Sequence, residues 1–223
     1  LHYPLRRQRQ MCIRDRAVDG DTVRLANGQL LRYLGLNAAE SRIKVGDEWV
    51  ERDSVWAKRA YEFNKNIVSG KRIDIEYDRQ KKDKYGRLLG YAFLGGDFIN
   101  EIILSEGLAV IDVRFPNFKY IDKICSAFKQ ARHHQKGVWA DLKNIDAKDA
   151  FRYEGDIVAV EARVLDIYPK EHIMIILMPF GFKLVIYKSN LKLFNGFDIA
   201  GLKGRKIKAH GIVGKYKGNY QMV

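Results

Sequence analysis

The sequence predicts a mainly β chain with a few helices, an α+β fold divided into two small domains. Short apolar segments that alternate with polar residues recur along the chain and are separated by turns rich in Gly and Asn. Helical spacing of apolar residues is restricted to segments before residue 142, and a period of two takes over after residue 152. The chain has 223 residues, of which 47% are hydrophobic, so it can bury a core.

The first domain, residues 17–142, is expected to open with strands. Residues 18–25 are predicted to form two strands around a turn at Asp19-Gly20-Asp21. Asn27-Gly28 predicts a hairpin because both residues tolerate a positive φ. The next strand covers residues 30–36, and the polar segment 41–52 is expected to be a loop.

Helices and strands alternate in the rest of the first domain. Amphipathic spacing predicts a helix over residues 53–68, whose inner face carries Trp56, Ala60, Phe63 and Ile67. Asn100 is a candidate cap for a short helix, because its side chain can accept from a backbone amide. The remaining elements are expected to be strands at 73–77, 88–94 and 109–113, a loop at 79–87, and a helix at 120–133.

The segment 143–152 is expected to link this domain to a second one, residues 153–223. Strands are predicted at 158–164, 173–178, 182–187, 206–213 and 220–223, with a short helix at 189–194. Three strands, a short helix and two strands follow the order of a small five-stranded OB-type barrel. The last strand stops at Val223 without a turn, so this domain is expected to be truncated.

The net charge favours a polyanionic partner. The chain has 40 Lys and Arg against 27 Asp and Glu, a formal charge of +13. Residues 1–16 contribute +4, residues 17–142 contribute +3, and residues 143–223 contribute +6, all of it from residues 201–217. No apolar run reaches the ~18 residues of a membrane span. Two cysteines are too few for a disulfide framework or a cysteine-based zinc site.

Residues 1–16 are interpreted as a non-native or disordered leader. They show neither helical nor strand periodicity, lack an apolar stretch typical of a secretory signal, and do not begin with Met. The string MCIRDR resembles translated sequencing-adapter read-through. The alternative is a basic arm that binds nucleic acid.

Three clusters in the first domain carry the chemistry: Asp19-Gly20-Asp21-Thr22, Arg32 with Asn37-Ala38-Ala39-Glu40, and Asp83-Lys84-Tyr85-Gly86-Arg87. Hydrolysis of a phosphodiester needs a hard cation with oxygen ligands, fork-shaped cations for the phosphate oxygens, and a base that positions water. The ordered segments VDGDTVRL, LRYLGLNAAE, DKYGRLLGYAF, EGLA and GVW resemble the staphylococcal nuclease (thermonuclease) family over about 125 residues. The resemblance implies a five-stranded OB barrel with three helices.

The resemblance also implies roles for individual residues. Arg32, Glu40 and Arg87 match the catalytic residues, with the arginines on phosphate and Glu40 as the proposed base for water. Asp21, Asn37 and the Ala38 carbonyl match the ligands of Ca²⁺, or of another divalent ion. Lys84, Tyr85 and Phe115 match substrate-binding positions, and Asp19 and Thr22 support the metal ligands.

This chain departs from the family pattern in three places. Position 37 is Asn where the family has Asp, so one negative charge is lost and weaker metal binding is expected. Position 39 is Ala where the family usually has Pro, which leaves the loop less rigid. Val113 and Phe115 replace two tyrosines that flank the nucleotide base; Phe115 can stack on a base and Val113 cannot.

Residues 153–223 resemble, more loosely, an OB-type nucleic-acid-binding domain found on some bacterial nucleases of this kind. Such surfaces combine a basic groove with exposed aromatic side chains. The candidates are Tyr187, Lys188, Arg205, Lys206, Lys208, Lys215, Tyr216 and Lys217. The alternative is that these basic side chains merely face water.

The function expected from the sequence is a calcium-dependent nuclease that cleaves DNA and RNA with low sequence specificity. Single strands are the favoured partner, and the protein is expected to be a monomer without membrane contact. The main alternative, favoured by Asn37, is an inactive nucleic-acid-binding scaffold of the same fold. Binding to an anionic membrane is a weaker alternative, since no basic amphipathic helix is evident. Family members imply an exported bacterial protein.

Overall fold

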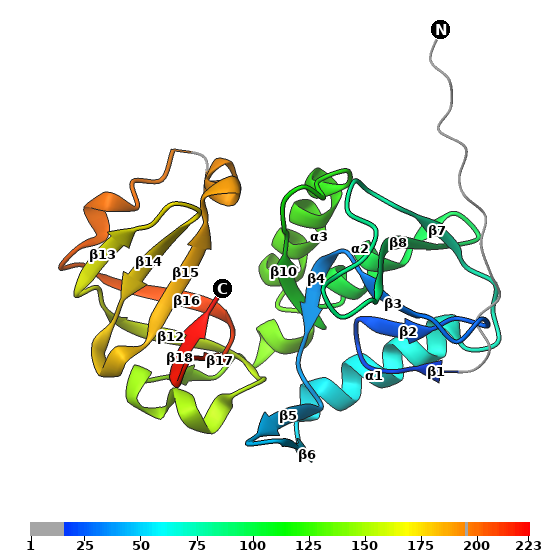
Figure 1. The fold of residues 1–223 in the computed structure, drawn as a ribbon, viewed down its shortest axis with the longest axis horizontal. Helices are drawn as coiled ribbons and strands as arrows, with labels where there is room; N and C mark the ends of the chain where they lie inside the picture. Colours follow the sequence, from blue (N-terminus) through cyan, green and yellow to red (C-terminus); the bar gives the residue numbers. More distant parts are fainter. Residues whose placement is uncertain (1–15, 195) are drawn as a thin grey trace, which may run out of the picture. The chain divides into compact units, whose positions relative to one another are not determined.

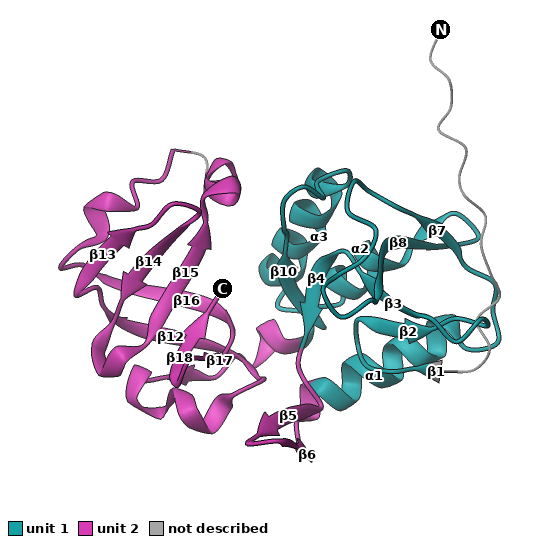
Figure 2. Cartoon of the chain, viewed as in Figure 1, with its two compact units in different colours: residues 1–38, 57–137 teal, residues 39–56, 138–223 magenta. Residues whose placement is uncertain are grey.

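The computed structural model describes residues 16–194 and 196–223, which form two compact units (Figure 2). Unit 1 contains the described residues up to Ala38 together with Ala57–Gly137, and unit 2 contains Ala39–Trp56 together with Val138–Val223. The prediction of a mainly β chain with helices is confirmed (Figure 1). The leader assigned to residues 1–16 lies outside the described residues, apart from Arg16.

Unit 1 is built on a twisted sheet with the strand order β1-β2-β3-β8-β7. Its strands are β1 (Arg16–Ala17), β2 (Thr22–Arg24), β3 (Leu30–Tyr33), β8 (Leu88–Leu94) and β7 (Asp74–Glu76), with β9 (Asp97–Phe98) pairing to β8. β3 and β8 are parallel, and the other neighbours are antiparallel. The predicted hairpin joins β2 to β3, and Gly28 has a φ of 84° at its turn.

The single strand expected over residues 30–36 is two strands instead. Gly35 has a φ of 84°, which turns the chain out of β3 and into β4 (Gly35–Ala38). β4 pairs with β10 (Ala109–Asp112) in a separate two-stranded sheet. A Cβ on residue 35 would lie 2.3 Å from Ile124 Cδ1, the end of a side chain that can move, so the positive φ is the stronger reason for a glycine here. The turn places Asn37 and Ala38 beyond the main sheet.

Three α-helices pack in the first part of the chain: α1 (Val55–Val68), α2 (Ile99–Ser105) and α3 (Ile121–His133), followed by the 3₁₀ helix η1 (Gly137–Ala140). α1 forms as predicted, but its fully buried positions are Ala57, Ala60, Asn64 and Val68. This face is rotated from the expected one because the polar Asn64 occupies its centre. α2 and α3 contact each other, and Ile124, Ala127 and Ala131 of α3 are buried.

Asn100 was expected to cap α2 but lies inside it. α2 begins at Ile99, and the Asn100 side chain is fully buried. Its Oδ1 accepts from the Ala92 amide at 3.0 Å, and its Nδ2 donates to the Leu34 carbonyl at 2.8 Å. Asn100 therefore ties β8 to the chain between β3 and β4, and satisfies two backbone groups that the sheets leave unpaired.

Unit 2 contains two larger sheets and one exposed hairpin. The strand order is β11-β12-β16 in the first sheet and β13-β14-β15-β18-β17 in the second, and the hairpin pairs β5 with β6. The bounds are β5 (Arg42–Val45), β6 (Glu48–Glu51), β11 (Asn144–Ile145), β12 (Ile157–Arg163), β13 (Asp166–Pro169), β14 (Ile173–Leu177), β15 (Lys183–Tyr187), β16 (Lys206–Ile212), β17 (Gly214–Tyr216) and β18 (Asn219–Met222).

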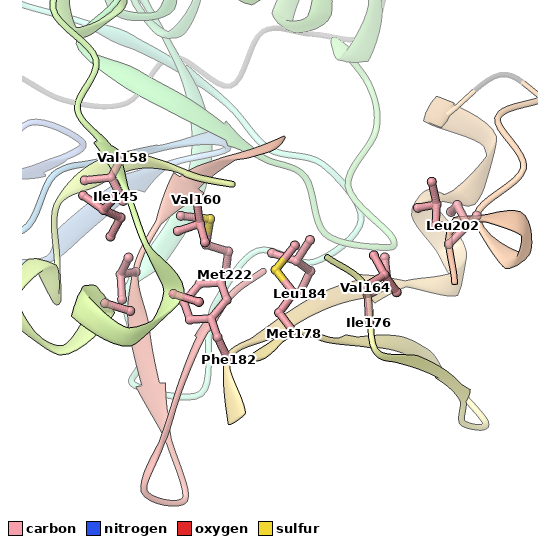
Figure 3. Packing of buried hydrophobic residues seen from close by; sticks show 14 residues of the cluster. Ile145, Val158, Val160, Val164, Ile176, Met178, Phe182, Leu184, Leu202 and Met222 are labelled. Carbon is pink, nitrogen blue, oxygen red and sulfur yellow. The ribbon is translucent and has the colours of Figure 1, made fainter. Parts of the chain in front are cut away.

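The two larger sheets of unit 2 are joined through their own strands. β12 runs into β13 after Arg163, and β16 runs into β17 across Val213, so each chain segment contributes to both sheets. β15 and β18 pair in parallel, and the remaining pairs within the second sheet are antiparallel. A buried cluster that includes Val160, Met178, Phe182 and Met222 fills the interior (Figure 3).

Two segments of unit 2 differ from the sequence-based expectation. The segment 41–52, expected to be a loop, forms the β5–β6 hairpin, whose turn carries Gly46 with a φ of 63°. None of its strand residues is buried, and its apolar residues lie among charged neighbours. The supposed linker 143–152 forms β11, which pairs with β12, and the 3₁₀ helix η2 (Ala147–Tyr153). Its small apolar side chains Ile145, Ala147 and Ala150 are part of the core cluster. Because polar and charged residues separate these apolar residues in the sequence, no regular apolar pattern indicates that the segment is packed.

The remaining connections of unit 2 include three short 3₁₀ helices: η3 (Pro179–Gly181), η4 (Lys188–Phe194) and η5 (Ala200–Leu202). η4 is the short helix predicted after the third strand. Within residues 16–194 and 196–223, no helix is both long and apolar enough to cross a membrane.

Candidate functional site

The turn between β1 and β2 aims the side chain of Asp21 into unit 1. The amides of Val18 and Asp19 both donate to the Thr22 carbonyl, at 2.8 and 3.3 Å, and Asp19 Oδ1 accepts from the Asp21 amide at 3.0 Å. A Cβ on Gly20 would lie 2.5 Å from the Ala60 Cβ and 2.7 Å from the Ala38 Cβ. Only glycine therefore lets the turn pack this closely against α1 and β4.

Asp21 is the centre of a hydrogen-bonded cluster. Its side chain is 3% exposed, and Oδ1 accepts from Arg32 Nη1 at 2.6 Å and from Thr22 Oγ1 at 2.8 Å. Oδ2 accepts from the Ala38 amide at 3.1 Å. Three donors from three different segments thus hold one buried carboxylate in a single orientation.

Arg32 joins Asp21 to Asn37. It lies on β3 opposite Thr22 of β2, and its side chain is 16% exposed. While Nη1 donates to Asp21, Nη2 donates to Asn37 Oδ1 at 2.6 Å. The structure therefore brings together Asp21, Thr22, Arg32, Asn37 and Ala38, five of the residues singled out from the sequence.

Asn64 on α1 supports this cluster, and the sequence analysis did not single it out. It is fully buried on α1, its Nδ2 donates to the Asp19 carbonyl at 2.8 Å, and its Oδ1 accepts from the Tyr33 hydroxyl at 3.0 Å. Burial, followed by the negative charges of Asp21 and Asp19, raises the pKa of Tyr33, so its hydroxyl keeps the proton that it donates. A polar residue in the centre of an apolar helix face was the available signal.

Arg87 is positioned by its own loop. Asp83 Oδ1 accepts from the amides of Tyr85 and Arg87 at 2.9 and 3.0 Å, and Asp83 Oδ2 accepts from Arg87 Nε at 2.7 Å. Partial burial raises the pKa of the Asp83 carboxyl, but the hydrogen bond from Arg87 and the two amides outweigh it and leave the pKa below its ordinary value. Asp83 was quoted in the motif but its orienting contacts were not foreseen.

Arg32 and Arg87 lie close to each other in the register of the first sheet. In the parallel pair β3–β8, Arg32 is opposite Leu89, and Arg87 precedes Leu89 by two residues, immediately before β8 begins. Because side chains two residues apart in extended chain share a face, this register favours placing both arginines on one side of the sheet. Two fork-shaped cations on one face can hold the oxygens of a phosphate.

The predicted substrate-binding side chains are exposed in unit 1. Tyr85 is 72% exposed and Phe115 is 63% exposed, whereas Val113 is buried. Lys84 Nζ lies 4.9 Å from the centre of the Tyr85 ring, and the Arg87 guanidinium lies 5.7 Å from it. An aromatic ring with two cations beside it is suited to a nucleotide, although no contact within the protein assigns it that role.

Glu40 belongs to unit 2, two residues along the chain from Ala38. Its amide donates to the Gly155 carbonyl at 2.9 Å, and a Cβ on Gly155, which has a φ of 86°, would lie 3.1 Å from the Glu40 Cβ. The backbone of Glu40 is therefore anchored to the C-terminal part of the chain. Its role as a base stays a prediction.

The expected cation ligands have suitable chemistry but low charge. Asp21 offers a carboxylate, Asn37 an amide oxygen and Ala38 a main-chain carbonyl, all hard oxygen donors of the kind that Ca²⁺ and Mg²⁺ bind. In the described residues no group of three or more His, Cys, Asp or Glu side chains could hold a metal ion. The donors fit a cation that also takes ligands from substrate phosphate and water, as Mg²⁺ sites commonly do.

The basic and aromatic candidates of unit 2 occupy three separate places. Tyr187 and Lys188 lie at the end of β15, Lys215, Tyr216 and Lys217 on β17 and its turn, and Arg205, Lys206 and Lys208 on or beside β16. Lys206 Nζ is 2.7 Å from Glu161 Oε1, and this hydrogen bond lowers the pKa of Glu161. The β16 lysines are thus partly neutralised.

The β17 hairpin keeps more of its charge available. Lys217 Nζ lies 5.6 Å from the Tyr216 ring centre, and Tyr216 is 59% exposed. Lys215 Nζ lies 5.4 Å from the Tyr220 ring centre. Two tyrosine rings, each with one lysine beside it, therefore make this the best-formed of the three groups for binding a base and its phosphate.

Comparison with known proteins covers the first part of the chain. A family model described as "Staphylococcal nuclease homologue" matches residues 30–141, which include Arg32, Asn37 and Arg87. The thermonuclease of Staphylococcus hyicus is 35% identical over 129 residues, which cover 56% of this chain and 73% of that protein.

Two bacterial endonucleases show the same level of similarity. The SPbeta prophage-derived endonuclease YokF of Bacillus subtilis (strain 168) is 36% identical over 131 residues, covering 56% of this chain and 43% of YokF. The endonuclease YncB of the same organism is 35% identical over 131 residues, covering 56% of this chain and 60% of YncB. The chain therefore spans most of the thermonuclease but only part of each endonuclease.

Proposed function

The chain belongs to the staphylococcal nuclease homologue family, a class of phosphodiester hydrolases, and we propose that it cleaves DNA and RNA with low sequence specificity and with the help of a divalent cation such as Ca²⁺. One observation supports this proposal most directly. The pairing of β3 with β8 brings Arg32 and the segment around Arg87 together, and each arginine is oriented by an aspartate.

The two arginines would bind the phosphate in different ways. Arg32 donates to Asp21 and Asn37 through its two terminal nitrogens, Nη1 and Nη2. Arg87 donates to Asp83 through Nε, so that contact does not use its two terminal nitrogens. Both side chains would stabilise the charge that develops on the phosphate oxygens in the transition state. Lys84, Tyr85 and Phe115 would hold the nucleotide next to them.

Asp21, Asn37 and the Ala38 carbonyl would hold the cation. A bound divalent cation would polarise a phosphate oxygen and lower the pKa of a bound water. Glu40 would orient that water or accept its proton. Asp19 and Thr22 would keep Asp21 in place through the contacts that they already make with it.

We also propose that unit 2 is an OB-type barrel that binds single-stranded nucleic acid, so that the chain carries two OB-type barrels in tandem. Two features of unit 2 support it: β12–β13 and β16–β17 each run from one sheet into the other, and β15 pairs with β18 in parallel. Its exposed Tyr216 and neighbouring lysines would retain a strand and raise the local concentration of substrate.

The test is degradation of plasmid and single-stranded DNA in the presence of Ca²⁺, Mg²⁺ or a chelator. We expect cleavage with a divalent cation and none with the chelator. Arg87→Ala is the matched control: it removes a phosphate donor and leaves Asp21, Asn37 and Ala38 unchanged, so its cleavage should be slower than that of the wild type but should still require the cation. Absence of cation-dependent cleavage at micromolar protein would contradict the proposal.

A second function is favoured by Asn37, which replaces a carboxylate with a neutral amide. In that case the protein would be a nucleic-acid-binding scaffold without activity. Retained binding of single-stranded DNA by a protein that cleaves neither substrate would support the scaffold and reject the nuclease.

A further inference from the structure

Arg32 occupies both side-chain oxygens that the proposed function reserves for a cation. Its Nη1 lies 2.6 Å from Asp21 Oδ1, and its Nη2 lies 2.6 Å from Asn37 Oδ1. The other Asp21 oxygen accepts from the Ala38 amide. One planar guanidinium therefore lies on one oxygen of each side chain, and its positive charge opposes the binding of a divalent cation at the same two oxygens.

The charges of Asp21, Arg32 and Asn37 determine whether a divalent cation can bind while Arg32 is in place. Asp21 and Arg32 neutralise each other, and Asn37 adds no charge to the three-residue cluster. Asp21 is 3% exposed and Arg32 is 16% exposed, so water screens the pair only weakly. An aspartate at position 37 would give the three side chains a net charge of −1, whereas asparagine leaves the three neutral as a group. Arg32 and a divalent cation are thus alternatives at this site and not neighbours.

Substrate phosphate offers Arg32 a partner equivalent to Asp21. A phosphate presents two anionic oxygens to a guanidinium fork, as a carboxylate does. If Arg32 transfers to the phosphate, Asp21 Oδ1 and Asn37 Oδ1 are released together. The same side-chain movement therefore binds the substrate and opens the cation site.

We propose that Arg32 is the resident cation of this site, and that nucleic-acid phosphate draws it away so that a divalent cation can bind tightly at Asp21 and Asn37. This inference rests on the proposed function for the identity of the site. It makes phosphate and cation binding mutually dependent, since each must strengthen the other by the same factor. Arg32 is the moving part that couples them.

The experiment is calorimetric titration of Ca²⁺ into the full chain without nucleotide, with thymidine, and with thymidine 5′-monophosphate. For the wild type we expect weak binding alone, no change with thymidine, and binding stronger by at least about fivefold with the monophosphate, the lower end of usual coupling factors. Arg32→Met should bind Ca²⁺ alone at least about fivefold more tightly than the wild type, with little further gain from the monophosphate.

Arg87→Met is the control variant, because Arg87 contacts Asp83 and not Asp21 or Asn37. Its affinity for Ca²⁺ alone should equal that of the wild type. If Arg32→Met binds Ca²⁺ no more tightly than the wild type, or more weakly, then Arg32 is only a support for Asp21 and the inference is wrong.

Asn37→Asp provides a second measurement if Arg32→Met does not fold. The added charge should strengthen Ca²⁺ binding without nucleotide more than binding with the monophosphate, so the ratio of the two affinities falls. An unchanged ratio would overturn the inference. This outcome can be separated from the nuclease test. If the protein cleaves DNA but the titrations do not show the expected changes, the proposed nuclease function stands and the role of Arg32 is rejected. If the titrations agree but no DNA is cleaved, the role of Arg32 stands and the nuclease function is rejected.

Discussion

Arg32 and Arg87 each donate to one aspartate, but the parts of the molecule that hold the two aspartates differ. Asp83 and Arg87 are four residues apart, and amides of the same loop bind Asp83. Asp21 and Arg32 are eleven residues apart, and Asp21 also depends on the Ala38 amide from β4. One arginine is therefore oriented by local sequence and the other by the meeting of three segments.

Burial follows the same division. The side chains of Asp83 and Arg87 are 16% and 28% exposed, whereas those of Asp21 and Arg32 are 3% and 16% exposed. A buried pair is more costly to break, because the remaining charge has no water to replace its partner. Similar ion pairs can therefore have different roles. The local Asp83–Arg87 pair orients one side chain, whereas the buried Asp21–Arg32 pair also holds together the segments that form the site.

The largest effects are expected from removing either arginine. Arg32→Ala and Arg87→Ala should each lower kcat about 10²- to 10³-fold, as the loss of one transition-state donor does in other hydrolases. Only Arg32→Ala should also destabilise the fold, by about 1–3 kcal/mol, because it leaves Asp21 buried without its cation. Single-turnover cleavage and urea unfolding measure these effects. Equal losses of unfolding free energy in Arg32→Ala and Arg87→Ala would contradict the expectation that the Asp21–Arg32 pair stabilises the fold more than the Asp83–Arg87 pair does.

Gly20→Ala probes the packing under the buried pair. The new Cβ would meet the Cβ atoms of Ala60 and Ala38 at 2.5 and 2.7 Å, so overpacking should cost about 1–3 kcal/mol and shift Asp21. Gly214→Ala is the matched control, since the nearest atom to its new Cβ lies 4.0 Å away. Urea unfolding and cleavage rates of both variants measure the effect; if Gly20→Ala keeps wild-type stability and activity, the turn is not held by close packing.

Asn64→Leu tests the support that α1 provides to the same turn. The Tyr33 hydroxyl and the Asp19 carbonyl would each lose a buried partner, which should cost about 1–3 kcal/mol. Tyr33→Phe removes only one of the two hydrogen bonds and should cost about 1 kcal/mol. A double-mutant cycle on unfolding free energies should give a non-zero coupling between the two positions; additive effects would show that the hydrogen bond contributes nothing.

The smallest effect is expected at the local pair. The folded-state pKa of Asp83 lies below its ordinary value of 3.8, so ionised Asp83 stabilises the fold above that value. Asp83→Asn should therefore cost about 0.5–1 kcal/mol at neutral pH, and the difference should vanish as the pH falls through the lowered pKa. Urea unfolding from neutral pH down to about pH 3 measures this, and a difference that grows towards acid would have the wrong sign.

Local chemistry made much of the fold predictable. The hairpin at Gly28, the strand over residues 88–94 and the helix ending at Val68 were predicted because turn residues and apolar periods act over a few residues. Packing between distant segments was not. The sequence pattern favours Asn100 as a cap, but Asn100 bridges β8 to the chain after β3, and nothing near it in sequence indicates those partners.

The side chains available for phosphate chemistry can be identified from sequence alone, and so can the loop that orients Arg87, because Asp83 reaches its partners within four residues. The bridge from Arg32 to Asp21 and Asn37 cannot, because those residues meet through the β2–β3 pairing and the turn at Gly35. The position of Asn64 beneath the turn also follows only from the tertiary structure. Hydrogen bonds between separate segments depend on which backbones pack together, and no local pattern encodes that.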